Sequence, residues 1–123
     1  MQTLVIEPTK FSPKVVMDPT GEVFIHGRSI LEDPSIFYSP VFKWLKVCDS
    51  ESLKMEIKLD YMNTSSSKQI YNMLRVIEDS AYIKNAQINW FYEEGDEDIL
   101  DLGKEFESQL DLNFSFFEYS ESA

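Results

Sequence analysis

The residues of this chain best suited to chemistry are five consecutive polar side chains near its middle, each a hydroxyl or an amide. In order they are Asn63, Thr64, Ser65, Ser66 and Ser67. A hydroxyl in such a run can receive a phosphate, act as a nucleophile when a base activates it, or cap a helix. The elements on either side decide which of these applies.

The polar run is predicted to lie between a strand and a helix. Residues 53–59 alternate between apolar and charged side chains, which is typical of a strand, and residues 65–80 have helical spacing. The apolar stripe of that helix is Ile70, Met73, Leu74 and Ile77. Free N–H groups and the dipole at a helix N-terminus favour an anion or a capping oxygen. Capping is the simpler interpretation on the residues alone, and Ser66 with Gln69 fits a capping box.

The rest of the chain alternates strands with helices. Strands are expected at residues 4–6, 14–17, 22–27 and 86–92, a final strand or extended tail at 113–119, and helices at 35–49 and 96–108. The turn Asp18-Pro19-Thr20-Gly21 joins two of the strands as an antiparallel hairpin. This order predicts one α/β domain over residues 1–123, with a mixed sheet, an N-terminal antiparallel hairpin and about three helices.

Charge and composition exclude several classes of partner. The chain has 22 acidic and 11 basic residues, and residues 61–123 alone hold 13 acids and 4 bases, a net charge of −9. Such a surface repels nucleic acid and anionic membranes, although it permits a basic protein partner. The sequence has no signal peptide, no long apolar run and only one cysteine, Cys48. These features predict a cytoplasmic protein without a disulfide.

The inventory of catalytic and binding motifs is sparse. The sequence has no glycine-rich phosphate loop, no dinucleotide-binding motif and no G-x-S-x-G elbow. His26 is the only histidine, and the acidic stretch at residues 93–101 lacks the ligand pattern of a calcium loop. The sequence therefore predicts neither a metal site nor a cofactor.

The polar run and its surroundings resemble a known family. Leu59-Asp60-Tyr61-Met62-Asn63-Thr64-Ser65-Ser66 resembles the Tyr-Leu-Asn-Thr-Ser-Ser signature of the SiaC family of bacterial regulatory phosphoproteins, with Met62 in place of the Leu. Pro40-Val41-Phe42-Lys43-Trp44-Leu45 and Ile88-Asn89-Trp90-Phe91-Tyr92 also match, and the likeness extends from about Thr9 to Phe117. The strand-to-helix hydroxyl is similar, too, to that of the STAS-type anti-anti-sigma-factor fold.

The resemblance implies a regulator that is not an enzyme. A protein kinase would phosphorylate Thr64 and a phosphatase would reverse the modification. The unmodified protein would bind an effector, which in the best-known branch is a diguanylate cyclase that controls cyclic-di-GMP and biofilm formation. Around Thr64, the phospho-loop and the partner-binding surface are expected to comprise Asp60, Asn63, Ser65, Ser66 and Lys68.

Two alternatives remain open on the sequence. One is a small hydrolase or transferase that uses a serine of the polar run as its nucleophile. The other is a constitutive protein-binding module, in which the polar run only caps the helix. The switch has a physical basis, because a phosphate on Thr64 would add negative charge close to Asp60 in a surface that binds a partner.

Overall fold

The computed structural model describes residues 1–120, which form alternating strands and helices. The elements are β1 (Leu4–Ile6), β2 (Lys14–Asp18), β3 (Glu22–Ser29), α1 (Pro34–Val47), β4 (Ser52–Met62), α2 (Thr64–Glu78), β5 (Asn85–Glu93), α3 (Glu97–Gln109) and β6 (Asn113–Tyr119). Each predicted element is confirmed, with ends that move by a few residues. The last element is a strand and not an extended tail.

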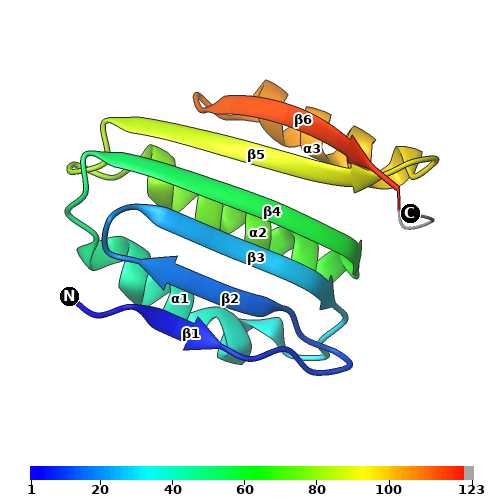
Figure 1. Cartoon of the computed structure of the whole chain (residues 1–123), viewed down its shortest axis with the longest axis horizontal. Helices are drawn as coiled ribbons and strands as arrows, with labels where there is room; N and C mark the ends of the chain where they lie inside the picture. Colours follow the sequence, from blue (N-terminus) through cyan, green and yellow to red (C-terminus); the bar gives the residue numbers. More distant parts are fainter. Residues whose placement is uncertain (121–123) are drawn as a thin grey trace.

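The strands of the described residues form one mixed sheet in the order β1-β2-β3-β4-β5-β6. The first three strands pair antiparallel, and β3 to β6 pair parallel. Each parallel pair is joined by a helix, and right-handed crossovers that proceed in one direction place successive helices on one face of a sheet. Figure 1 shows α1, α2 and α3 on the same face. The predicted α/β fold with an N-terminal antiparallel hairpin is confirmed.

The hydrophobic core lies between the helices and the sheet face that they cover. Every second residue of β4 points into it, and these residues are at most 2% exposed: Leu53, Met55, Ile57 and Leu59. The apolar stripe predicted for α2 packs against them and is equally buried. The intervening β4 residues Lys54, Glu56 and Lys58 lie on the opposite face of the sheet, which no helix of residues 1–120 covers.

Close packing fixes α3 against β5. Gly103 of α3 lies so near Trp90 that a Cβ atom at this position would be 2.6 Å from the indole Nε1. The same Nε1 donates a hydrogen bond of 2.9 Å to the Ile99 carbonyl. Glycine is therefore required here by the close approach of a helix to a large buried ring.

The carboxyl-terminal part of β4 leaves β5 and stays with β3. Pairing of β4 with β5 ends at Ile57 and Trp90, whereas β4 continues to Met62. Figure 1 shows β4 and β5 diverging towards these ends. The register of β3 against β4 shifts at Gly27, whose φ of 119° is a left-handed conformation that glycine adopts without strain. As a result, the junction between β4 and α2 lies beside the end of β3 and the segment that leads into α1.

Candidate functional site

Asn63 organises the junction between β4 and α2. Its side-chain oxygen accepts a hydrogen bond of 3.0 Å from the Ser66 N–H and so caps α2. Its side-chain nitrogen donates to the Leu31 carbonyl at 3.0 Å, and its backbone N–H donates to the Ser29 carbonyl at 3.0 Å. The predicted capping box of Ser66 and Gln69 is wrong, because the cap lies three residues earlier and Ser66 is already inside the helix.

Ser66 is the buried member of the polar run. It is 0% exposed, and its hydroxyl accepts a hydrogen bond of 2.8 Å from the Ser29 hydroxyl. The Ser29 hydroxyl in turn accepts one of 2.8 Å from the phenol of Tyr38. This chain of hydroxyls joins β3, α1 and α2 beneath the junction. Ser66 therefore shapes the loop from inside, and in the folded protein it is accessible neither to a partner protein nor to a substrate.

Burial changes the acidity of the Tyr38 phenol. Loss of contact with water raises the pKa of Tyr38 from its usual 10.0 to about 12, and the hydrogen bond with Ser29 opposes part of this rise. The Tyr38 phenol therefore stays a neutral hydrogen-bond donor at alkaline pH values at which an exposed tyrosine ionises.

Because the pKa of Tyr38 is raised in the folded protein, the free energy of unfolding depends on pH in the alkaline range. Between about pH 10 and about pH 12 the unfolded chain loses the Tyr38 proton while the folded protein keeps it. We expect the free energy of unfolding to fall through this window, by up to about 1.4 kcal/mol per pH unit from this group. Urea unfolding of the wild type and of Tyr38→Phe across the window measures the effect. The variant lacks this titration, so equal slopes for the two proteins would contradict the prediction.

Thr64 and Ser65 are the exposed hydroxyls at the start of α2. Thr64 is the first residue of the helix, and its hydroxyl makes no hydrogen bond within residues 1–120, although its carbonyl accepts one of 2.8 Å from Ser67. The Ser65 hydroxyl is 3.4 Å from the side-chain oxygen of Asn63. Both hydroxyls can therefore be reached by a modifying enzyme, and exposure alone does not choose between them.

The charged residues predicted around Thr64 lie on two sides of it. Asp60 lies at the register shift of β4, on the sheet face away from the helices, where Arg28 of β3 approaches it to 3.5 Å. Both side chains are substantially exposed, so this ion pair contributes little to stability. Lys68 is exposed on α2, four residues beyond Thr64. Arg28 could not be identified from the sequence, because its place beside Asp60 depends on the pairing of β3 with β4, and the two residues are 32 positions apart.

Three exposed apolar side chains lie at the same end of the sheet as Thr64. Phe11, Ile36 and Tyr61 are 57%, 73% and 57% exposed. Tyr61 lies near the end of β4 and Ile36 in the first turn of α1, while the Phe11 carbonyl accepts a hydrogen bond of 2.9 Å from Ile30, just after β3. Exposed apolar side chains at this end provide contact area that a protein partner can bury. The sequence could not identify this group, since exposure depends on the fold.

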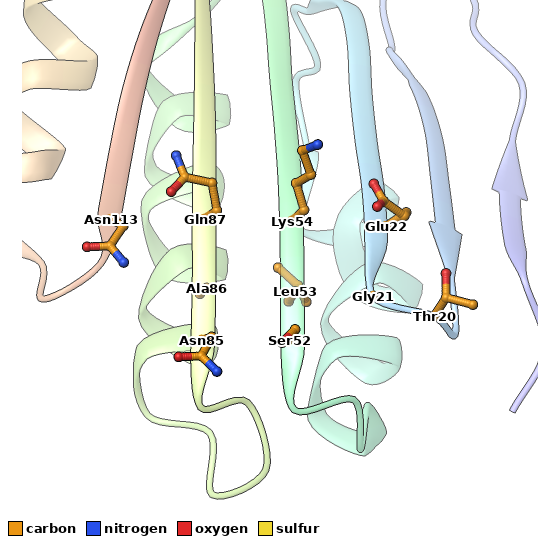
Figure 2. A pocket seen from close by; sticks show the side chains of 10 residues that line it. All are labelled: Thr20, Gly21, Glu22, Ser52, Leu53, Lys54, Asn85, Ala86, Gln87 and Asn113. Carbon is orange, nitrogen blue, oxygen red and sulfur yellow. The ribbon is translucent and has the colours of Figure 1, made fainter.

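A hollow of about 470 Å³ lies at the opposite end of the parallel strands. Figure 2 shows Lys54, Gln87 and Asn113 beside one another on β4, β5 and β6, with Glu22 on β3. None of the residues predicted for the functional site lines it. Within residues 1–120, no three His, Cys, Asp or Glu side chains come together as metal ligands. The hollow thus adds no catalytic group to the site at Thr64.

No helix within residues 1–120 is both long and apolar enough to cross a bilayer.

The sequence and the fold of this chain are similar to those of known proteins. An uncharacterised protein of Pseudomonas aeruginosa strain UCBPP-PA14 is 25% identical over 126 residues, which cover 98% of this chain and 100% of that protein. The crystal structure of apo-SiaC from P. aeruginosa superposes with a TM-score of 0.81 at 22% identity, over 95% of this chain and 99% of that one. In the crystal structure of the diguanylate cyclase SiaD in complex with its activator SiaC, also from P. aeruginosa, the matching chain gives a TM-score of 0.84 at 24% identity, over 94% and 99%.

These structural likenesses establish the fold. The sequence establishes the relationship, because residues 6–119 match the family model of the SiaC family regulatory phosphoproteins, and the chain therefore belongs to that family.

Proposed function

We propose that this protein is a non-enzymatic bacterial regulator that binds an effector protein while Thr64 is unmodified and releases it when Thr64 is phosphorylated. The observation that supports this proposal best is the placement of Thr64. Its hydroxyl is exposed at the first position of α2, at the same end of the sheet as the apolar side chains of Phe11, Ile36 and Tyr61. The same end therefore offers a surface for a protein partner and a group that can change the charge of that surface.

The electrostatics of the junction favour a switch over a change of fold. A phosphate adds about −1.5 to −2 charges at pH 7. Free N–H groups at the start of α2 and the ammonium of Lys68 would stabilise this charge within the protein. A bound effector would instead have to cover a dianion close in sequence to Asp60 and take it out of water, which is costly. Phosphorylation is therefore expected to release the effector without unfolding the regulator.

The effector is proposed to be a diguanylate cyclase. The support is the crystal structure in which SiaC, a protein of the same fold and family, is in complex with the diguanylate cyclase SiaD as its activator. By this proposal the protein would raise cyclic-di-GMP synthesis when Thr64 is unmodified.

The proposal requires a kinase and a phosphatase that act on Thr64, and it is tested by the modification itself. We expect protein purified from its own cells to contain a fraction heavier by the mass of one phosphate, and peptide mapping to place that phosphate on Thr64. Treatment with a protein phosphatase should remove it. A chain that stays unmodified in all growth phases would instead indicate a constitutive binding module, and a phosphate on Ser65 would reassign the switch.

A further inference from the structure

The two edges of the sheet differ in how they are protected against pairing with other chains. Strand β1 has only three residues and is followed by Pro8. A short strand and a nearby proline both hinder the pairing of an edge strand with another chain. Strand β6 has seven residues, NFSFFEY, with no proline, lysine or arginine and no shift in its register with β5. The one charged residue of β6 is Glu118, near its carboxyl end, so most of this edge strand remains a template for a further strand.

The backbone of β6 offers alternate residues to such a strand. The Glu94 N–H donates a hydrogen bond of 2.7 Å to the Tyr119 carbonyl, so the backbone groups of Tyr119 face β5. Because N–H and C=O groups alternate in direction along a strand, those of Phe114, Phe116 and Glu118 face outward. Within the described part of the chain, no strand pairs with this outer side of β6.

The side chains and charges near β6 indicate what kind of segment would pair with it. Phe117 is 42% exposed and stacks on Phe91 with ring centroids 5.0 Å apart, which provides an apolar surface beside the edge. The carboxyl end of β6 lies against an acidic segment, since Glu94 bonds to Tyr119 and six acids occur between residues 93 and 101. Glu118 on β6 is exposed as well. The ammonium groups of Lys58 and Lys104 lie 4.5 and 4.0 Å from the ring centroids of Tyr119 and Phe116, but the acids near this edge outnumber these two lysines. A segment with lysine or arginine among apolar residues would match both properties, whereas a second copy of this chain would bring two acidic segments together.

We propose that the outer edge of β6 binds an extended, basic segment of another protein as an additional strand of the sheet. The backbone hydrogen bonds of Phe114, Phe116 and Glu118 would provide affinity, and alternate apolar and basic side chains would provide selectivity. This interaction does not depend on Thr64, which lies at the junction of β4 and α2.

A pair of synthetic peptides tests the proposal on the intact protein. One alternates valine and lysine, and the other alternates valine and glutamate. We expect the lysine peptide to bind at least about tenfold more tightly, and to slow hydrogen exchange at the Phe114 and Phe116 amides while leaving the Phe117 amide unchanged. Nuclear magnetic resonance measures both quantities in one titration.

A matched pair of variants separates edge pairing from general attraction to an acidic surface. Glu118→Pro removes an outward N–H without removing a hydrogen bond to β5, whereas Glu118→Ala removes the same charge and keeps the N–H. We expect the proline variant to bind the lysine peptide at least about tenfold more weakly than the alanine variant. Circular dichroism of both variants verifies the fold. If the proline variant does not fold, the hydrogen-exchange experiment on the wild-type protein tests the proposal without it.

Three results would overturn the proposal. The first is absence of binding by the lysine peptide, and the second is equal binding by the two Glu118 variants. The third is protection of Phe114 and Phe116 that rises with protein concentration without any peptide, since this would identify a second copy of the chain as the occupant of the edge.

Discussion

Replacing Thr64 with glutamate is expected to weaken binding of the effector at least about 100-fold while changing the free energy of unfolding by less than about 0.5 kcal/mol. The fold should tolerate the substitution because Thr64 is exposed and a carboxylate at the first position of α2 interacts favourably with the helix dipole. Binding should be lost because the effector would bury this charge in an interface that accepts an uncharged hydroxyl. Co-purification of the effector with tagged variants from cells, followed by titration of the purified pair, measures the change.

Two control variants show whether position and charge are both required. Thr64→Ala removes the hydroxyl without adding charge, and we expect it to bind the effector nearly as well as the wild type. Gln109→Glu adds the same charge at an exposed position near the end of α3 and should also leave binding intact. Equal recovery of the effector by Thr64→Glu and the wild type would contradict the switch.

Replacing Ser66 with aspartate, unlike the change at Thr64, is expected to destabilise the fold. We expect the free energy of unfolding to fall by about 3 kcal/mol or more. The side chain at this position is completely buried and lies against the hydroxyl of Ser29, which Tyr38 holds in place from the other side. The single hydroxyl donor at this position, that of Ser29, does not replace the hydration of a carboxylate. Urea unfolding of the purified variant, or its absence from the soluble fraction of an expressing cell, reports the loss.

The neighbouring position provides the comparison for Ser66. Ser65→Asp adds the same group on the exposed side of the same helical turn and should change stability by less than about 0.5 kcal/mol. Ser66→Ala should lower the free energy of unfolding by about 1–2 kcal/mol, a loss between those of the two aspartate variants, because the Ser29 hydroxyl loses its acceptor. A Ser66→Asp variant as stable as the wild type would show that this side chain can reach water, and Ser66 would again be a possible phosphate acceptor.

The sequence by itself determined the elements and their order. Alternation in β4 and the helical stripe of α2 are local patterns of apolar residues, and burial of one face of each element follows directly from them. The turn from Asp18 to Gly21 likewise determined the antiparallel hairpin, because its residues prefer the required backbone angles. The sequence also located the polar run at a helix N-terminus. The choice of Thr64 as phosphate acceptor came from the family signature and is still a prediction.

Only the tertiary structure distinguished the members of the polar run from one another. Asn63, Thr64 and Ser66 have similar capping preferences, so local chemistry did not separate a cap, an exposed hydroxyl and a buried one. The separation arises because Ser66 faces Ser29, which is 37 residues distant in sequence, and because Asn63 bonds to the backbone of Leu31. The same holds for the ion pair of Arg28 with Asp60 and for the unprotected edge of β6, which depend on strand register and on the position of a strand in the sheet. These are contacts between distant segments, and a single sequence contains no local pattern that specifies them.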